Sequence, residues 1–465
     1  MSQDTQALLE HFTRLQDTFF NQKTKPLSWR LAQLSRMGDM LNEHVTELQA
    51  ALLSDLGKQA TEAWNTEIGF LLKELRHTKK KVKKWMRVRH VSSPVAIQPA
   101  KSYLQPEPLG VVAIFGAWNY PVQLTLSPVI AAIAAGNAVC LKPSEVAPQT
   151  SALIVRLCSD YLDEEAVWAV EGDATTAAHL LNLPFNHFFY TGGGQIGKKV
   201  MRAAADHLAS VTLELGGKSP VIVSQQCDLA KAAKRIVWGK FMNAGQTCIA
   251  PDYVLVESAV VAQFQSELIL AIESFYGKKV IDSNDYGRIV SNRHLHRLTG
   301  LLKDEKLAES QIWGGELHSE NRFLAPTVIF NCPADADIMD DEIFGPILPI
   351  LTVQDMDEAL AFVQARPQPL ACYLFSKDTR EQHRVEQRIR CGSLCINDTM
   401  VFMLNAELPF GGVGPSGMGR YHGKWGFDTF SHLKPVVKRS FMFDVDLRYP
   451  PYTDFKQKLL KKLLG

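Results

Sequence analysis

The sequence has little that would place the protein in a membrane, in a secretory pathway or on nucleic acid. No apolar run among its 465 residues is long enough to span a bilayer, and the polar N-terminus lacks the basic-then-apolar order of a secretion signal. Its 50 lysines and arginines nearly balance its 49 aspartates and glutamates, which leaves a formal net charge of +1. Such a balance does not favour binding to a polyanion. We therefore expect a cytoplasmic protein with no nucleic-acid partner.

The eight cysteines form neither a disulfide framework nor a metal-site pattern. Cys391 and Cys395 lie close together, but no second cysteine pair and no histidine pair completes a zinc set. Free cysteines are most often small core residues. We expect reduced thiols and no bound metal.

The chain is long enough for two or three domains, and its hydrophobic pattern changes after the first hundred residues. Before that point the pattern predicts helices, because Leu8, Phe12 and Leu15 recur at helical spacing on one face. A basic run over 79–89 is expected to be a solvated helix face, with an anion-binding patch as the alternative. A proline-punctuated stretch over 93–108 then ends the helical pattern.

Further along, short apolar runs rich in valine, isoleucine and phenylalanine alternate with helical patterns. The expected strands are 110–115, 138–141, 167–170, 187–190 and 211–215, and the expected helices are 122–135, 149–161, 175–181 and 196–207. A second series of the same kind runs from 221 to 396 and predicts a separate lobe. Continuous apolar strands separated by helices indicate parallel sheets covered on both faces. This architecture tends to bind nucleotides, although a fold alone establishes no function.

The last segment, 449–465, predicts a short basic amphipathic helix. Phe455, Leu459 and Leu460 share one side of that helix, and its lysines lie toward the other. Such a helix docks on its own protein, frames a pocket entrance or makes weak peripheral contact with a membrane. We favour docking, because a helix this short binds lipid weakly by itself.

A glycine-rich segment at 191–197 joins an expected strand to an expected helix. Gly192, Gly194 and Gly197 satisfy the G-x-G-x-x-G spacing, which lets the backbone approach a pyrophosphate at a helix N-terminus. A tight turn explains the same glycines almost as well. The ordinary dinucleotide rule would place the acidic residue about 20 positions further on, Glu214, at the ribose.

Three further side chains have catalytic chemistry. Cys248 ends the segment 243–248, and a nucleophilic thiol needs such an accessible loop position and a lowered pKa. Glu214 stands beside paired glycines, and Asn119 follows the first expected strand, where its amide can donate to a developing oxyanion. Each has an ordinary alternative when taken singly: a core cysteine in a turn, a carboxylate that caps a strand end, and an asparagine that satisfies its own turn.

Together these segments resemble the aldehyde dehydrogenase superfamily, and within it the class 3 branch that includes the fatty aldehyde dehydrogenases. The shared strings occur in family order from about residue 5 to about residue 452, so chance assembly is negligible. They are EPLGVV (107–112), WNYP (118–121), LKPSE (141–145), YTG (190–192), LELGGKSP (213–220), GQTC (245–248), EIFGP (342–346) and LPFGGVG (408–414). The strings FSH (430–432) and RYPP (448–451) look particularly like class 3.

The resemblance implies oxidation of aldehydes to carboxylic acids. Cys248 would attack the aldehyde carbonyl as a thiolate, while the Asn119 amide and the Cys248 backbone N–H hold the oxyanion. Hydride would leave to a nicotinamide, and Glu214 would activate the water that hydrolyses the resulting thioester.

The same resemblance implies a cofactor site and an apolar channel. The cofactor would be NAD, with NADP as a second candidate because class 3 relatives often accept both. The residues implied for the cofactor are Lys142 and Glu145 at the adenine-side ribose, Gly192 and Gly197 near the phosphates, Glu342 at the nicotinamide ribose and Phe344 against its ring. The residues implied for the channel are Tyr120, Trp238, Phe241, Met242 and Phe410, each of which is otherwise a plain core residue. Such a channel suits medium- or long-chain aliphatic or aromatic aldehydes.

Two rival functions stay open. A CoA-acylating enzyme on the same scaffold would not need a hydrolytic base, so Glu214 argues against it. A structural or binding protein without catalysis is disfavoured by the intact set of Cys248, Glu214 and Asn119. The sequence also departs from its relatives, because Gly193 and Gly194 stand where serine and threonine are common.

The fold implied by the resemblance is α/β and of the aldehyde dehydrogenase type, with two Rossmann-type domains on parallel sheets and a small β oligomerisation element. The expected parts are an NAD-binding domain (1–92 and 109–213, with 401–419), a catalytic domain (214–400), the oligomerisation element (93–108 and 420–448) and the tail (449–465). The class 3 resemblance further implies a homodimer.

Overall fold

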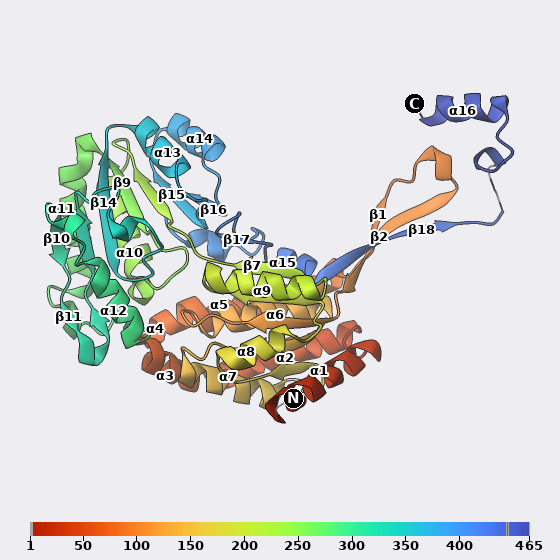
Figure 1. The fold of residues 1–465 in the computed structure, drawn as a ribbon, viewed down its shortest axis with the longest axis horizontal. Helices are drawn as coiled ribbons and strands as arrows, with labels where there is room; N and C mark the ends of the chain where they lie inside the picture. Colours follow the sequence, from red (N-terminus) through yellow and green to blue (C-terminus); the bar gives the residue numbers. More distant parts are fainter. Residues whose placement is uncertain (1–2, 443, 445, 465) are drawn as a thin grey trace.

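Two lobes and a projecting arm make up the protein (Figure 1). The computed structural model describes residues 3–442, 444 and 446–464. Residues 1–2, 443, 445 and 465, which fall within the expected domain ranges, lie outside the described residues. Each lobe is built on a sheet of mainly parallel strands, so the α/β expectation is confirmed.

The first lobe contains a six-stranded sheet. Its strands, in spatial order, are β17 (Gly417–Met418), β7 (Ser210–Glu214), β6 (His187–Thr191), β3 (Val111–Phe115), β4 (Ala138–Lys142) and β5 (Val167–Ala169). Neighbouring strands are parallel except β17 and β7, which are antiparallel. The helices that connect them are α6 (Gln123–Ala135), α7 (Pro148–Tyr161), α8 (Ala174–Leu181) and α9 (Gly194–Asp206). The strands and helices predicted for this region are therefore confirmed to within two residues.

The N-terminal segment is helical, as predicted. Its helices are α1 (Gln3–Phe20), α2 (Leu27–Glu43), α3 (Val45–Leu56), α4 (Ala60–Ala63) and α5 (Gly69–Trp85), and a π-helical turn (Trp64–Ile68) joins the last two. Leu8, Phe12 and Leu15 are buried, as their spacing predicted. Lys79 and Lys83, in the basic run, are exposed, which confirms a solvated helix face.

Side chains of β3 alternate between two cores, which explains why the strand is apolar throughout. Val112 and Ile114 pack into the core shared with α2, α5 and α6, whereas Val111 and Ala113 pack into the core shared with α1, α8 and α9. A parallel strand buried on both faces has this pattern. The carboxyl ends of β3, β4 and β6 consequently lie along one edge of the sheet, where ligands of such folds bind.

The second lobe contains a seven-stranded sheet. Its strands, in spatial order, are β10 (Gln311–Gly314), β13 (Thr327–Phe330), β14 (Ile347–Val353), β9 (Tyr253–Glu257), β8 (Pro220–Val223), β15 (Ala371–Phe375) and β16 (Ser393–Ile396). Only β10, at one edge, pairs antiparallel within this sheet. The helices of this lobe are α10 (Leu229–Phe241), α11 (Val261–Tyr276), α12 (Asn292–Leu301), α13 (Met356–Gln364) and α14 (Thr379–Arg388), and a small hairpin pairs β11 (Leu317–His318) with β12 (Phe323–Leu324). The predicted second α/β lobe is thus present.

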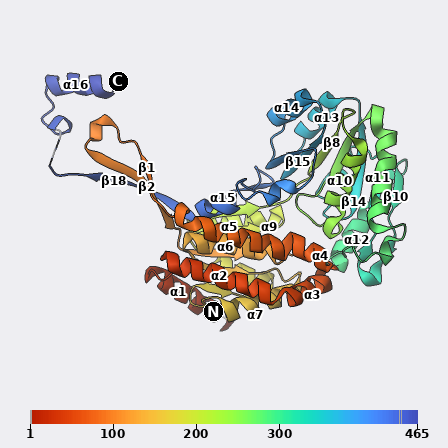
Figure 2. The ribbon, with the colours of Figure 1, turned by 180° about the vertical axis from the view of Figure 1, so that it is seen from behind.

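A three-stranded antiparallel sheet forms the arm, which points away from both lobes in opposite views (Figures 1 and 2). Its strands are β1 (Arg89–Val91), β2 (Ala100–Pro108) and β18 (Ser431–Arg439). The arm thus includes β1, which lies before the range 93–108 expected for the oligomerisation element. Within the same expected range, α15 (Gly423–Thr429) instead packs on α5 and α6 of the first lobe.

The tail forms α16 (Asp454–Leu464), beyond the far end of β18 (Figure 1). The helix is held locally, since the Lys456 ammonium group contacts the Tyr449 carbonyl oxygen at 3.1 Å and the Asp446 carboxylate at 3.0 Å. Among the described residues no helix combines the length and apolar character needed to cross a membrane.

All eight cysteines are free thiols, as expected. Cys140, Cys158 and Cys372 are buried, in keeping with a core role. Within the described part of the chain, no group of histidine, cysteine and carboxylate side chains is arranged to hold a metal ion.

Candidate active site

The two lobes meet around a cavity of about 790 Å³. Cys248 lines this cavity, together with four of the five side chains expected to form an apolar channel: Tyr120, Trp238, Met242 and Phe410. Other apolar side chains in its wall are Phe70, Leu124, Phe275, Tyr276, Met400, Val401, Met403 and Leu404. The cavity therefore offers an apolar passage that reaches Cys248.

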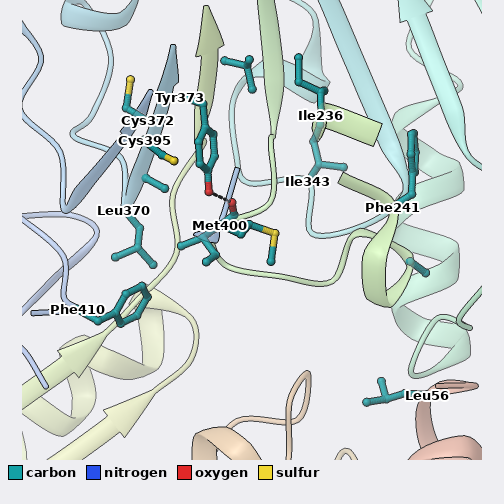
Figure 3. Close-up of a cluster of buried hydrophobic side chains, with 14 of the residues drawn as sticks. Leu56, Ile236, Phe241, Ile343, Leu370, Cys372, Tyr373, Cys395, Met400 and Phe410 are labelled. Carbon is teal, nitrogen blue, oxygen red and sulfur yellow. Dashed lines mark hydrogen bonds between the residues drawn. The ribbon is translucent and has the colours of Figure 1, made fainter. Parts of the chain in front are cut away.

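Phe241 does not belong to this wall, so the expectation of a channel residue is corrected at that position. Its side chain is 1% exposed and packs in the core of the second lobe (Figure 3). The reason is helical geometry: Trp238 on α10 and Met242 just past its end are four residues apart and both line the cavity, whereas Phe241 follows Val237 on the buried face.

A strained turn carries Cys248 from the end of α10 to the cavity. Asn243 and Ala244 have φ angles of +52° and +50°, which non-glycine residues adopt rarely. Gly245 also has a positive φ, and a Cβ there would lie 2.3 Å from the Gly345 carbonyl oxygen. Just beyond Cys248, the Ile249 carbonyl oxygen accepts a hydrogen bond from the Tyr373 hydroxyl (Figure 3). Strained backbone of this kind clusters at functional sites.

The Cys248 thiol has its pKa raised, which contradicts the lowered pKa expected from the sequence. Burial is the main cause, and the nearby carboxylates of Glu342 and Glu214 add to it. Low-dielectric surroundings and neighbouring negative charge both disfavour a thiolate. The thiol therefore needs a proton acceptor before it can act as a nucleophile.

Glu214 is the last residue of β7, and its side chain is 3% exposed. Neither carboxylate oxygen has a hydrogen-bond partner among residues 3–442, 444 and 446–464. Burial raises the pKa of Glu214 well above its usual value. A strand-capping carboxylate would be hydrogen-bonded, so this geometry does not fit the ordinary alternative. An unpartnered buried carboxyl group near a thiol is instead suited to proton transfer.

Asn119 lies in the loop after β3 and is joined to the segment that carries Cys248. Its side-chain amide donates to the Gln246 carbonyl oxygen at 3.1 Å, and its own carbonyl oxygen accepts from the Asn243 amide at 2.7 Å. The neighbouring Tyr120 hydroxyl is 2.6 Å from the Thr247 hydroxyl. The structure thus brings the Asn119 loop and the Cys248 loop together across the lobe boundary.

Four of the expected cofactor residues lie at the carboxyl edge of the six-stranded sheet. Lys142 ends β4 and forms a 2.8 Å ion pair with Glu145. Gly192, after β6, has a φ of +156°, and a Cβ there would lie 2.4 Å from the Tyr190 hydroxyl. Gly197 lies on the side of α9 that faces Leu215, since a Cβ on this glycine would lie 2.8 Å from a Leu215 methyl group. Gly192 and Gly197 lie close to the start of α9, and the N-terminus of a helix stabilises phosphate groups in general.

The loop at the start of α9 fits a dinucleotide in one further respect. A Cβ at Gly193 or at Gly194 would meet no atom within 4 Å, so open space lies over both residues. The Gly192 N–H donates to the Glu214 carbonyl oxygen at 2.9 Å, which fixes the loop to β7. Gly193 and Gly194 stand where relatives commonly have serine and threonine. Although these glycines offer no hydroxyl group, they leave room for a pyrophosphate group.

The other two expected cofactor residues come from the second lobe. The Glu342 carboxylate lies against Gly216, where a Cβ would be only 1.8 Å from it, and burial raises the pKa of Glu342 to about 8. The Phe344 ring packs edge-on against the Trp118 ring, with centroids 5.2 Å apart. Phe344 thus contacts the loop after β3 of the first lobe, and Glu342 lies beside the segment that follows β7.

Several residues of the site carried no recognisable signal in the sequence. Glu62 and Asp285 are the carboxylates that line the cavity, and burial raises the pKa of Glu62 to about 7. Lys58 and Glu67 form a buried ion pair next to Asn119. Charged residues are exposed by default, so only the tertiary structure reveals that Glu62, Lys58 and Glu67 are not.

Comparison with known proteins agrees with this arrangement. A family profile described as "Aldehyde dehydrogenase family" matches residues 5–436. The 4,4'-diaponeurosporen-aldehyde dehydrogenase of Staphylococcus aureus (strain NCTC 8325 / PS 47) is 44% identical over 435 residues, 93% of this chain and 94% of the relative. The "Aldehyde dehydrogenase, dimeric NADP-preferring" of Rattus norvegicus is 41% identical over 440 residues, 94% of this chain and 96% of the relative.

A solved structure described as the substrate-bound state of Staphylococcus aureus AldH has a TM-score of 0.96 and 42% identity, and covers 98% of this chain and 99% of its own. The chain belongs to the aldehyde dehydrogenase family. It is an enzyme that oxidises aldehydes with NAD or NADP. Enzymes named as family 3 aldehyde dehydrogenases from Arabidopsis thaliana and Mus musculus are among its relatives, in keeping with the class 3 resemblance.

Proposed function

We propose that this enzyme oxidises medium- or long-chain aliphatic or aromatic aldehydes to carboxylic acids through a thioester at Cys248. The observation that carries the proposal is the pairing of Cys248 with Glu214. The thiol lines an apolar cavity, and a buried carboxyl group without a hydrogen-bond partner in the described residues lies close enough to affect its pKa.

The reaction would begin with loss of the Cys248 proton. Glu214 is the base that the geometry offers, since its buried carboxyl group has no hydrogen-bond partner among the described residues and lies close enough to the thiol to affect the thiol pKa. The sulfur then bonds to the aldehyde carbon, and the carbonyl oxygen becomes an oxyanion. The Asn119 amide and the Cys248 backbone N–H hold that oxygen, and each such donor contributes about 10²–10³ in rate.

When bound, the nicotinamide cofactor accepts the hydride that leaves the aldehyde carbon. A thioester then remains on Cys248. Once Glu214 has passed the thiol proton to the solvent, it removes a proton from a water molecule, the water oxygen bonds to the acyl carbon, and the carbon–sulfur bond breaks. This releases the acid and regenerates the cysteine.

We assign the cofactor site to six residues. Lys142 and Glu145 would hold the adenine-side ribose, Gly192 and Gly197 would shape the phosphate loop, and Glu342 and Phe344 would hold the nicotinamide end. NAD is the main candidate, because a carboxylate at Glu145 repels a 2′-phosphate. Acceptance of NADP as well is part of the proposal, since a relative is named as NADP-preferring.

The substrate class rests on the cavity wall. Tyr120, Trp238, Met242 and Phe410 give it aromatic and aliphatic surface, and no lysine or arginine among the described residues lines it to attract an anionic substrate. A relative named as a 4,4'-diaponeurosporen-aldehyde dehydrogenase supports the same class. Burial of apolar surface would supply most of the binding free energy.

We also propose a cytoplasmic homodimer that pairs through the arm formed by β1, β2 and β18. Val91, Leu433 and Val437 are exposed on the arm. Exposed apolar side chains on a three-stranded sheet indicate a surface that another protein chain buries. A relative named as dimeric supports this assembly.

The first lobe would serve as the NAD-binding domain and the second as the catalytic domain. Helix α16 would dock on the protein, with weak membrane contact as the alternative.

A rapid-mixing experiment with Glu214→Gln tests the reaction sequence. The variant is expected to release a burst of about one NADH per active site, more slowly than the parent because the thiol has lost its proton acceptor, and then to turn over at least 100-fold more slowly than the parent, because hydrolysis also needs Glu214. The burst is followed at pH 9, where hydroxide from the solvent takes the thiol proton more readily. Loss of NAD affinity with an unchanged burst size would instead support the ribose-binding role for Glu214.

A further inference from the structure

Lys58 and Glu67 form an ion pair in the interior of the first lobe. Their Nζ and Oε1 atoms are 2.5 Å apart, and both side chains are 0% exposed. Moving two charges out of water costs more than their attraction commonly returns, so apolar residues often stabilise a core equally well. The contacts of this pair therefore matter more than its contribution to stability.

The Lys58 ammonium group reaches the loop that carries Asn119. It donates to the Asn119 carbonyl oxygen at 3.2 Å and lies 4.1 Å from the centre of the Tyr120 ring. With the bond to Glu67, the ammonium group has three partners, one for each of its hydrogens. Lys58 faces inward because it directly follows Gly57, whose φ of +64° ends α3.

Glu67 holds the other end of the same loop. Its Oε2 atom accepts the backbone N–H groups of Val122 at 2.8 Å and of Gln123 at 3.2 Å, where α6 begins. Glu67 itself lies in the π-helical turn (Trp64–Ile68), a feature frequent at functional sites. The ion pair thus contacts the loop both at Asn119 and at its junction with α6.

The backbone of Asn119 is fixed in this way, while its side chain stays available. The Asn119 carbonyl oxygen accepts from Lys58 and from Asn243, and one amide N–H donates to the Gln246 carbonyl oxygen. A primary amide has two N–H donors, so one remains for an oxyanion at the Cys248 adduct.

We infer that the Lys58–Glu67 ion pair is a positioning element for this reaction, and that it acts through Asn119. It holds the Asn119 backbone at the place from which the amide reaches the oxyanion. A displacement of about 1 Å in such a donor can slow a reaction about 100-fold. The inference rests on the proposed role of Asn119 as an oxyanion donor.

The test is a double-mutant cycle on the rate of the NADH burst. Asn119→Ala is expected to slow the burst about 10²–10³-fold, and Lys58→Met about 10–100-fold. If Lys58 acts through Asn119, adding Lys58→Met to Asn119→Ala changes the burst by less than about 2-fold. Any larger additional loss, or a parental burst rate in Lys58→Met alone, overturns the inference. A parental burst rate in Asn119→Ala would instead overturn the proposed role of Asn119.

A second variant guards against misfolding, because Lys58→Met leaves the Glu67 charge buried without its partner. Lys58→Met with Glu67→Gln removes both charges and keeps an oxygen that accepts from α6. The same cycle with Asn119→Ala is expected to give the same non-additive result, and an additive result counts against the inference.

Arg30→Met is the matched control. Arg30, on α2, is another buried cation that contacts α6, and it donates to the Ala134 carbonyl oxygen at the opposite end of α6. This variant should lower the melting temperature and keep the parental burst rate. A burst slowed as much as in Lys58→Met would mean that the loss of a contact at either end of α6 slows the reaction. That result would contradict a specific role for the Lys58–Glu67 ion pair.

Discussion

The Glu62 carboxylate accepts a hydrogen bond from the backbone N–H of Asn243, with 2.9 Å between oxygen and nitrogen. Glu62 comes from the first lobe and Asn243 from the second, in the strained turn that leads to Cys248. The bond therefore ties the position of the proposed nucleophile to the contact between the lobes.

Removing this acceptor should destabilise the turn. Glu62→Ala leaves a buried N–H without a partner, so we expect the free energy of unfolding to fall by about 1–3 kcal/mol. Urea denaturation followed by tryptophan fluorescence measures the change. Glu62→Gln keeps an oxygen acceptor and should lose less than half as much. Equal losses in the two variants would contradict the assigned hydrogen bond.

Stability should fall as the pH rises from about 5 to about 7, and Glu74 should account for part of the loss. Burial raises the pKa of Glu74 to about 7 from 4.5, and its carboxyl group accepts a hydrogen bond from the Ser127 hydroxyl at 2.6 Å. A raised carboxyl pKa means that the folded state binds more protons than the unfolded state between these pH values. Stability is therefore present at low pH and is lost as the pH increases, by about 2–3 kcal/mol for this group.

Glu74→Gln removes that titration and keeps an oxygen acceptor for Ser127. The free energy of unfolding, measured by urea denaturation at pH 5, 6, 7 and 8, should depend less on pH in the variant than in the parent. Parallel curves for the two proteins would show that Glu74 does not titrate in this range.

A charge on the exposed arm should separate the proposed dimer. Val437 lies on β18 and is 56% exposed in the single chain, so Val437→Glu would place a carboxylate in the proposed interface without changing a buried core. We expect sedimentation velocity to give a dimer for the parent and a monomer for the variant. Leu208→Glu, at a 95% exposed position after α9, is the control and should stay dimeric. A monomeric parent would end the proposal.

The sequence was most informative where one local pattern decides the structure. Apolar runs predicted β3, β4 and β6 to within two residues, because a strand buried on both faces has no other pattern. Helical spacing predicted the buried face of α1 in the same way. The family strings brought Cys248, Glu214 and Asn119 into one site that none of the three segments predicted alone.

Other features depend on tertiary contacts that no local pattern encodes. Phe241 and Met242 are adjacent and both apolar, yet only Met242 lines the cavity. Lys58 and Glu67 look like ordinary surface charges in the sequence, and their burial depends on the loop that they contact. The raised pKa of Cys248 likewise arises from burial and from carboxylates distant in the chain.

The most direct test of the account is the mass of the Cys248 peptide after reaction. Glu214→Gln is mixed with NAD and hexanal, quenched in acid within seconds, digested and analysed by mass spectrometry. The peptide should gain the mass of the aldehyde less two hydrogens, as a thioester requires, and Cys248→Ala should show no such adduct. An unmodified Cys248 peptide from protein that has released its NADH burst would contradict the covalent mechanism.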